Sequence, residues 1–260
     1  MNTKYDIIVL WAGSGWLTVA LGLAAAWKKV ALIEQWKIGG DCTNYGCIPS
    51  KALIDIAKSG EYPFSEAMTE TRKRRKGIQD EETPEKIAAH GITVIAWSGS
   101  FKDSHTISID GEKEITAKYI VISTGSHANT LEFPGVDSDD ILTNETIFEI
   151  TEDMKNLVII GGGYIGCELA EAFANLWVQV TIIQRNNRLI PREESESSLL
   201  LDEILRKKEI KILTKANAER WEAGFLIVKD EDDEIQNIQY DKILVALGRT
   251  PNIEGLISKK

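Results

Sequence analysis

One pattern of apolar and polar positions occurs twice along the chain. In each copy a short β-branched run is followed by a turn, a helix rich in small residues and a second β-branched run. The first copy spans Tyr5 to Glu34, and the second spans Asn156 to about Arg185. A strand, a helix and a further strand in this order form a parallel βαβ unit. The duplication therefore predicts an α/β fold with two Rossmann-like, dinucleotide-binding domains built on parallel sheets.

The boundaries of the predicted elements follow from where each apolar run begins and ends. In the first copy we expect a strand over 6–10, a turn over 11–16, a helix to about residue 27 and a strand over 30–33. In the second copy we expect a strand over 157–160, a turn over 161–166, a helix over 167–176 and a strand over 178–183. Elsewhere the pattern favours helices over 64–90, short strands over 94–123 and a β-meander over 210–247.

Composition and charge narrow the classes of function. The 260 residues are 43% hydrophobic and carry a formal net charge of −10. This acidic charge repels nucleic acid and anionic lipid, so we expect neither as a partner. No apolar run approaches the ~20 residues that cross a bilayer, and the N-terminus leads directly into a strand, so we expect a cytoplasmic protein without membrane contact. In that compartment a cysteine pair is typically catalytic, and we expect no metal site.

The second turn carries a complete GxGxxG sequence. Gly161, Gly163 and Gly166 stand between an apolar run and a helix. In that context the glycines let the backbone approach a pyrophosphate, which then lies at the N-terminus of the helix. The motif indicates a nucleotide site, against the alternative of a turn that is only tightly packed.

The first turn reads WAGSGW and contradicts the pattern that surrounds it. Only Gly13 stands where the motif needs glycine, because Trp11 and Trp16 occupy the outer positions. The first position makes the tight turn and the third lets the helix pack on the strand, so an indole suits neither. Glu34 nevertheless follows Trp11 by 23 residues, where a carboxylate binds the ribose hydroxyls of a dinucleotide.

The segment Gly39 to Lys51, GGDCTNYGCIPSK, contains two cysteines five residues apart. In a regular helix the Cα atoms of such a pair lie ~8–9 Å apart, beyond the ~7 Å limit for a disulfide. For these two cysteines to form a disulfide, the segment would have to depart from a regular helix, and Gly46 is placed to permit this. A cysteine near the start of a helix has a lowered pKa, which supplies the thiolate for exchange. Two simply buried cysteines would leave the glycine pair and the PSK sequence unexplained.

This segment is very similar to the active-site signature of the class I flavoprotein disulfide reductases, the family of dihydrolipoamide dehydrogenase, glutathione reductase and mercuric reductase. The resemblance implies that Cys42 is the interchange thiol and that Cys47 is the charge-transfer thiol facing the flavin. It also implies that Lys51 lies beside flavin N5 with Glu168 as its ion-pair partner, and that Tyr164 gates the nicotinamide pocket.

The resemblance extends over nearly the whole chain. The sequence STGS resembles the family's crossover before the nucleotide domain, and LVALGRTPN resembles its exit. From the motifs and the resemblance together, the expected cofactor-binding residues are Trp11, Gly13, Trp16, Glu34, Gly39, Gly40, Thr124, Gly125, Gly161, Gly163, Tyr164, Gly166, Arg185, Gly248 and Arg249.

The resemblance implies an incomplete FAD-binding domain over residues 1–150 and an NAD(P)-binding domain over 151–260, with the C-terminal dimerisation domain absent. The resemblance implies that the complete parent is a homodimer. In it, NAD(P)H reduces FAD, FAD reduces the cysteine disulfide, and the resulting dithiol reduces a small-molecule or protein-bound disulfide. The reverse reaction oxidises a dithiol substrate. Three alternatives stay open. These are a catalytically incompetent nucleotide-binding fragment, a mercuric-reductase-like metal reductase and a flavoprotein oxidase that does not use its cysteines.

The end of the second copy bears on the choice of nucleotide. Gln184 stands where NAD-specific members of the family generally carry a glutamate, and Arg185 and Arg188 follow it. A neutral residue does not repel a 2′-phosphate, and arginine offers it a bidentate partner. We therefore expect a preference for NADP, with NAD as the second choice, against the alternative that both arginines are only solvated.

The tryptophans form a pattern of their own. Six of the seven stand where related sequences commonly carry glycine, namely Trp11, Trp16, Trp27, Trp36, Trp97 and Trp177. The resemblance does not resolve Trp221, which lies in a turn-like segment. A single base separates the codons GGA and UGA, and some bacterial lineages read UGA as glycine. Our hypothesis is that the sequence reflects translation with the wrong code and that each tryptophan is physiologically glycine. The alternative is that the tryptophans are real and the flavin site is destroyed.

Overall fold

The computed structural model describes residues 3–131, 136–222 and 224–256. Contacts between Cα atoms divide the chain into two compact units. The first contains the described residues of 1–48, 75–127 and 251–260, and the second contains those of 49–74 and 128–250. This division differs from a single boundary near residue 150, because residues 49–74 and 128–150 group with the second copy of the βαβ pattern.

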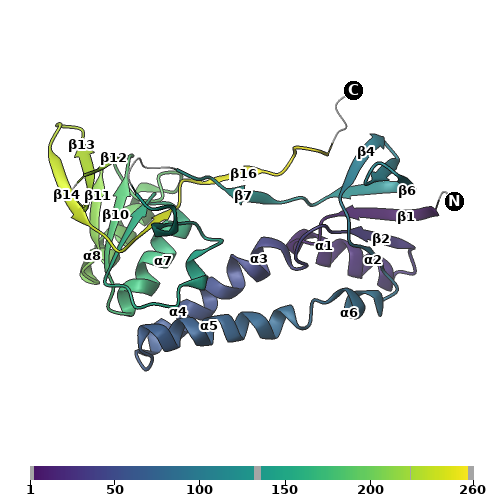
Figure 1. Cartoon of the computed structure of the whole chain (residues 1–260), viewed down its shortest axis with the longest axis horizontal. Coiled ribbons are helices and arrows are strands. Elements are labelled where there is room, and N and C mark those ends of the chain that lie inside the picture. Colours follow the sequence, from purple (N-terminus) through teal and green to yellow (C-terminus); the bar gives the residue numbers. More distant parts are fainter. Residues whose placement is uncertain (1–2, 132–135, 223, 257–260) are drawn as a thin grey trace. The chain divides into compact units, whose positions relative to one another are not determined.

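The first unit is built on a six-stranded sheet in the order β3-β2-β1-β6-β5-β4. Figure 1 labels β1, β2, β4 and β6 of this sheet. Its strands are β1 (Thr3–Leu10), β2 (Val30–Ile33), β3 (Thr93–Ile95), β4 (Gly99–Asp103), β5 (Thr106–Ile109) and β6 (Lys113–Ile122). The strands β3, β2, β1 and β6 run parallel, and β5 and β4 continue from β6 as antiparallel neighbours. The parallel βαβ unit is confirmed, and β2 has the predicted bounds.

The connection between β1 and β2 is more irregular than the single helix that the sequence predicts. It consists of α1 (Ser14–Trp16), a π-helical segment η1 (Leu17–Leu21) and α2 (Gly22–Ala25). Trp16 and Ala20 from this connection are buried in one cluster with Val9 and Leu32 of the sheet. Single π-helical turns within α-helices are rare and are frequently found at functional sites. Here it directly follows the residue whose indole enters the core.

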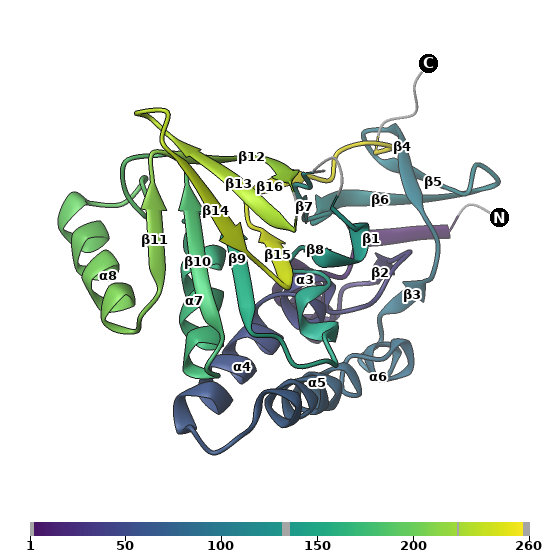
Figure 2. The same ribbon diagram turned by 60° about the vertical axis from the view of Figure 1, so that its left-hand side comes forward.

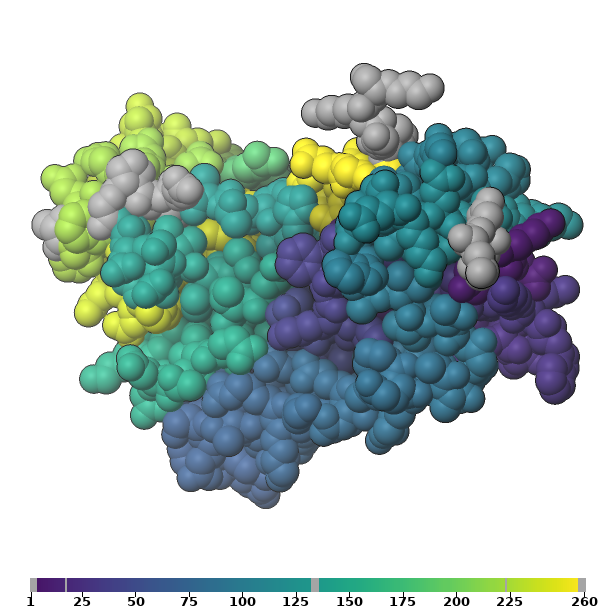
Figure 3. Space-filling model, turned by 45° about the vertical axis from the view of Figure 1, so that its right-hand side comes forward, coloured from purple at the N-terminus to yellow at the C-terminus, as the bar shows by residue number. Residues whose placement is uncertain are grey.

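Several helices follow β2, namely α3 (Gly40–Asn44), α4 (Cys47–Ser59), α5 (Phe64–Gln79) and α6 (Pro84–Ala88). The last two confirm the helices predicted over residues 64–90. One face of α5 is buried through Phe64, Ala67, Met68 and Thr71. The remaining face of α5 is polar and largely exposed, and it forms part of the surface in Figure 3.

The second unit contains a parallel sheet in the order β11-β10-β9-β15-β8 (Figure 2). Its strands are β8 (Ile141–Leu142), β9 (Asn156–Ile160), β10 (Gln179–Gln184), β11 (Lys211–Thr214) and β15 (Lys242–Val245). The helix α7 (Tyr164–Asn175) connects β9 to β10, and α8 (Ser195–Lys207) connects β10 to β11. The apolar face of α7 packs on the sheet, since Leu169 and Phe173 share a buried cluster with Ile159 and Ile182.

The β-meander is shorter than predicted. Within the described residues, β12 (Ala216–Glu222), β13 (Phe225–Asp230) and β14 (Ile235–Gln239) form an antiparallel sheet. The strands β11 and β15, which the prediction over 210–247 included, belong instead to the parallel sheet. Short strands with two or three consecutive apolar residues suit either arrangement, so periodicity alone cannot separate them.

Short elements complete the fold. The strands β7 (Ser126–Ala128) and β16 (Arg249–Pro251) pair with each other. Single 3₁₀ turns, η2 and η3, occur at Ser138–Asp140 and Ile147–Glu149. Among the described residues, no helix has both the length and the apolar character needed to cross a membrane.

Candidate functional site

The second glycine loop connects β9 to α7, and its backbone requires glycine. Gly161 has a φ of 114°, and a Cβ at this position would overlap Ala246 O. A Cβ at Gly166 would overlap Gly161 O, because the first turn of α7 packs directly on the loop. Around Gly163, the N-cap residue of α7, there is open space. The loop therefore fits a dinucleotide, whose pyrophosphate would lie at the N-terminus of the helix.

The residues at the end of β10 flank this loop. Gln184 is buried, where its Oε1 accepts a hydrogen bond from Gly162 N at 3.4 Å and its Nε2 donates to Arg188 O at 3.1 Å. The Arg188 guanidinium donates to two backbone oxygens of the following loop, so it shapes that loop. Arg185 is exposed, and within the described part of the chain its guanidinium has no hydrogen bond or ion pair. Of the two arginines considered for a 2′-phosphate, Arg185 is the one available.

Two polar contacts lie on the helices of the second unit. The ion pair expected between Lys51 and Glu168 is present, with Lys51 Nζ on α4 against Glu168 Oε1 on α7. Lys51 follows Cys47 by four residues, so both lie on one face of α4. Tyr164 begins α7 and donates its hydroxyl to Glu193, and this hydrogen bond raises the pKa of Tyr164. Their roles beside flavin and nicotinamide remain predictions.

The segment that carries the two cysteines, residues 39–51, packs on the first loop of the first unit. Gly39 N donates to Ala12 O at 2.9 Å, and a Cβ at Gly40 would lie 2.5 Å from Gly13 Cα. Gly39 and Gly40 also have left-handed backbones, with φ of 88° and 56°. The glycine pair thus permits a close approach of two loops that side chains would prevent.

Glu34 closes the first loop from the end of β2. Its Oε2 accepts a hydrogen bond from Ala12 N at 2.6 Å, and its Oε1 accepts one from Trp36 N at 2.7 Å. Burial raises the pKa of the Glu34 carboxyl, and these N–H groups oppose the rise. The carboxylate lies at the strand end beside the loop, which is where a ribose-binding group is predicted.

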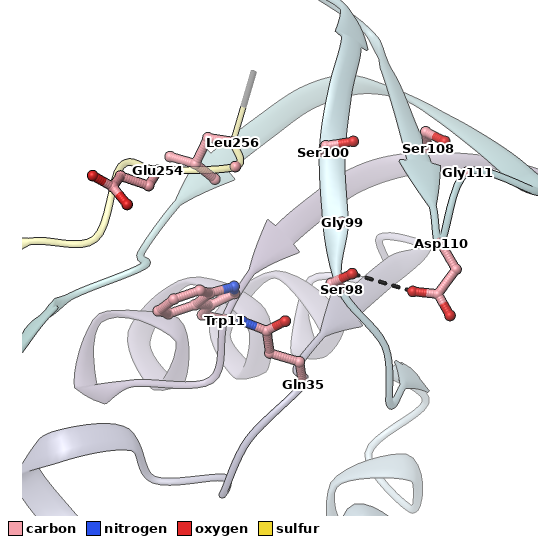
Figure 4. Close-up of a pocket in the computed structure, with 11 residues that line it drawn as sticks. Trp11, Gln35, Ser98, Gly99, Ser100, Ser108, Asp110, Gly111, Glu254 and Leu256 are labelled. Atoms are coloured by element: carbon pink, nitrogen blue, oxygen red, sulfur yellow. Dashed lines mark hydrogen bonds between the residues drawn. The ribbon is translucent and has the colours of Figure 1, made fainter. Parts of the chain in front are cut away.

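The tryptophans of the first loop break its resemblance to the second loop. Trp11 has a φ of 70°, and its indole projects into a cavity of about 290 Å³ that Gln35, Ser98 and Leu256 also line (Figure 4). Trp16 is fully buried, and among the described residues its Nε1 has no hydrogen-bond partner. With these two side chains the loop does not fit the pyrophosphate of FAD, although the residues around the loop do.

The cysteine pair lies at the predicted break in the helix. The helix α3 ends at Asn44 and α4 begins at Cys47, so only Tyr45 and Gly46 lie between them. Gly46 acts through its size, because a Cβ there would meet Asp41 O at 3.1 Å. The break therefore depends on close packing of the backbone of α3 against this turn.

The thiols differ in their surroundings. Cys42 is half-buried, whereas Cys47 is exposed. Burial, followed by the contact with Cys47 and the charge of Glu82, raises the pKa of Cys42 from 9.0 to about 11. The expectation of a lowered pKa is therefore wrong for Cys42, which lies in the middle of a five-residue helix. Cys167 is buried, as predicted for a packing residue, and burial raises its pKa to about 12.

A buried asparagine at the end of α3 belongs to this site, although no sequence pattern indicated it. Asn44 Nδ2 donates to Ile38 O at 3.0 Å and to Gly40 O at 2.7 Å, and its Oδ1 accepts from Gln79 Nε2 at 2.8 Å. Arg75 Nη1 donates to the Asn44 carbonyl at 3.2 Å. The network fixes the cysteine-bearing turn to α5. A single asparagine forms no pattern in the sequence that would predict its burial, so only the tertiary structure shows that it is buried.

The segments that resemble the crossover and the exit have structural contacts. Gly125 and Gly248 have left-handed backbones, with φ of 63° and 98°. The carbonyl of the buried Thr124 accepts from Asn252 Nδ2 at 2.9 Å, and Arg249 donates to the Asn144 side chain at 2.9 Å. These contacts hold the two segments in place, and cofactor binding by them remains a prediction.

The family of the chain follows from comparison with known proteins. The family model for pyridine nucleotide-disulphide oxidoreductases matches residues 5–260. The chain belongs to this family. It is 31% identical over 274 residues to the mercuric reductase of Staphylococcus aureus, an alignment that covers 97% of this chain and 49% of that protein. It is 33% identical over 288 residues to a dihydrolipoyl dehydrogenase of Corynebacterium glutamicum, covering 98% and 59% of the two chains.

The same relationship holds in three dimensions. The solved HOCl-induced flavoprotein disulfide reductase RclA from Escherichia coli superposes with a TM-score of 0.84 at 30% identity, covering 97% of this chain and 58% of that one. The predicted fold class, with Rossmann-type dinucleotide-binding folds, is thereby confirmed. The pyridine nucleotide-disulphide oxidoreductase described here spans about half the length of the mercuric reductase that it matches.

Proposed function

We propose that this pyridine nucleotide-disulphide oxidoreductase chain carries two working parts of NAD(P)H-linked disulfide reduction. One is a nucleotide site at the second glycine loop, and the other is a redox site at Cys42 and Cys47. The observation that carries the proposal is the position of the two thiols on either side of the break between α3 and α4, in a segment that packs on the first loop. When it is bound, FAD supplies the two-electron link between the nicotinamide and the cysteine pair.

The cysteine pair exchanges electrons with a small-molecule or protein-bound disulfide. Cys42, as a thiolate, attacks one sulfur of the substrate, and the other substrate sulfur leaves as a thiolate. Cys47 then attacks the Cys42 sulfur, which releases the second substrate thiolate and closes the Cys42–Cys47 disulfide. Two electrons pass from the pair to the substrate, and the two thiol protons end on the substrate thiols. The reverse sequence oxidises a dithiol. Such a pair suits the cytoplasm, where thiols are kept reduced.

The nucleotide of this site is NADP rather than NAD in our proposal. Gln184 is neutral and turned toward the loop, so it does not repel a 2′-phosphate. The exposed Arg185 guanidinium is available as a bidentate partner. A hydrogen bond to a charged group contributes ~1.5–3 kcal/mol, so Arg185→Ala should weaken NADPH binding at least about tenfold.

Calorimetry tests the choice of nucleotide. We expect tighter binding of NADPH than of NADH, and Arg185→Ala should weaken only the binding of NADPH. Arg220→Ala is the matched control, because Arg220 lies on β12 and pairs there with Glu222. Equal affinities for both nucleotides, with no effect of Arg185→Ala, would refute the NADP assignment.

Thiol trapping tests the redox site independently of any flavin. The chain is equilibrated in buffers of reduced and oxidised glutathione, alkylated and digested. We expect a Cys42–Cys47 disulfide that forms and opens with the buffer potential, while the buried Cys167 stays reduced. Cys47→Ser should abolish this disulfide, and Cys167→Ala should not change it. A chain that binds NADPH but never forms the disulfide is the nucleotide-binding fragment considered above, and the redox proposal then fails.

A further inference from the structure

We propose that glycine occupies the positions of Trp11, Trp16, Trp27 and Trp177 in the protein that the cell makes. The first loop is then a complete dinucleotide-binding loop of the same kind as the second. The inference rests on backbone geometry and on an internal comparison between the two copies of the βαβ pattern. It depends on the proposed function only for its flavin measurement.

The backbone conformation at three of these positions is the one that glycine adopts freely. Trp11, Trp27 and Trp177 have φ values of 70°, 62° and 65°. In this left-handed region the Cβ of other residues meets the following carbonyl oxygen, whereas glycine has no Cβ. A bulky aromatic residue is among those least expected there. Trp27 and Trp177 are largely exposed, so burial of their indoles gives no reason for tryptophan at these two positions.

The helix ends at Trp27 and Trp177 have the hydrogen bonds of a Schellman motif. After the first helix, Trp27 N donates to Ala24 O at 3.0 Å and Lys28 N donates to Leu23 O at 3.1 Å. After α7, the N–H groups of Trp177 and the following residue make the corresponding bonds at 3.0 Å and 3.2 Å. The left-handed position of this motif is usually glycine. Both indoles project into solvent, 96% and 90% exposed, so neither contributes to a core.

The second loop shows what the first loop requires at position 11. Trp11 N donates to Ile33 O at 2.7 Å, and Gly161 N donates to Ile183 O at 2.9 Å. The two residues therefore occupy the same place between their strands. At Gly161 even a Cβ would overlap a backbone oxygen. The copy with glycine thus leaves no room for the side chain that the other copy carries.

Position 16 corresponds to Gly166, where a Cβ would overlap the backbone of the loop. Trp16 is accommodated by a change in the helix, since the connection is broken by the π-helical segment Leu17–Leu21, whereas α7 is continuous. Its indole N–H is buried without a partner among the described residues, and burying an unpaired donor is unfavourable. Trp16 is therefore incompatible with the close packing that the second copy shows at the corresponding position, Gly166.

Trp221 provides an internal contrast. It lies in β12 opposite Leu226, in a regular antiparallel pair, without a left-handed backbone. Its indole is partly covered, with 37% of its surface exposed. The geometry gives no reason for glycine at this position, so Trp221→Gly serves as the matched control for the replacements.

Mass spectrometry of the protein purified from its own cells is the direct test. The tryptic peptide from Tyr5 to Lys28 contains three of the four positions, and the peptide from Asn156 to Arg185 contains the fourth. For each of these positions that a peptide contains, we expect its mass to be lower than the mass of the printed sequence by the mass difference between a tryptophan and a glycine residue. Tryptophan in these peptides overturns the inference. Glycine in them, with no flavin bound by the native protein, leaves the inference standing and refutes the flavin part of the proposed function.

Recombinant variants give a second test, in which the inference and its alternative predict opposite changes in melting temperature. If Trp16 were a true core residue, Trp16→Gly would leave a large cavity and lower the melting temperature. We expect instead that Trp11→Gly with Trp16→Gly increases flavin retained after reconstitution and does not lower the melting temperature. Trp27→Gly and Trp177→Gly should each raise it by about 2–4 °C. Trp221→Gly should lower it, because glycine weakens a strand. A fall in melting temperature for all five replacements overturns the inference.

Discussion

The raised pKa of Cys42 predicts that this thiol is alkylated slowly near neutral pH. Its pKa rises from 9.0 to about 11, so the thiolate fraction at pH 7 falls from about 10⁻² to about 10⁻⁴. Because the thiolate is the species that reacts, Cys42 in the folded, reduced chain should be alkylated about a hundredfold more slowly than in the unfolded chain. The deficit should be constant below pH 9 and should disappear as the pH rises through 11.

The rates can be followed with iodoacetamide between pH 7 and pH 11, using tandem mass spectrometry of the tryptic peptide that carries both cysteines. The relative sizes of the causes that raise the pKa of Cys42 predict the effects of two variants. Cys47→Ala removes the hydrogen bond and the charge of the neighbouring sulfur, so it should lower the pKa of Cys42 by more than Glu82→Gln does. Glu81→Gln is the control, since Glu81 pairs with Lys86 instead. A midpoint at or below 9 for Cys42 in the folded chain would refute this explanation.

Further substitutions address the two loops and the ion pair. Gly166→Ala should destabilise the chain by about 1–3 kcal/mol in urea denaturation, because its Cβ overlaps Gly161 O. Gly163→Ala, where space is open, should leave stability within about 1 kcal/mol, and equal effects of the two would contradict the packing argument. Asn44→Ala should lower the free energy of unfolding by about 1–3 kcal/mol through the polar groups that it leaves unpaired, and an unchanged midpoint would count against the network. Glu168→Gln should change stability by less than about 1 kcal/mol, since its lysine partner is 62% exposed; a larger loss would show that the pair supports the fold.

Local features of the fold were predictable where the signal lies within a few residues. The strand Val30–Ile33 is an apolar run bounded by polar residues, and its bounds are as predicted. The interruption between the two cysteines followed from helix geometry and the disulfide limit alone. The β-meander was less predictable, because β11 and β15 have apolar runs like those of antiparallel strands but pair in the parallel sheet.

The surroundings of the candidate site residues were less predictable than their positions in the sequence. The resemblance of the segment around Cys42 and Cys47 to a family signature singled out the pair, but burial and the charge of Glu82, forty residues away in sequence, raise the pKa of Cys42. Likewise, Arg185 and Arg188 have the same chemistry in the sequence. Only the tertiary structure shows that Arg188 donates hydrogen bonds to backbone oxygens, whereas Arg185 is exposed.

The sequence by itself determined the duplication, the complete second glycine loop and the cysteine turn, since each depends on spacing along the chain. It also exposed the conflict of Trp11 and Trp16 with the motif around them. Only the tertiary structure decided that Trp27 and Trp177 have left-handed backbones at exposed helix ends, and that Asn44 fixes the redox turn to α5. Backbone conformation, burial and polar pairing depend on contacts between distant segments, and no pattern of neighbouring residues encodes those contacts.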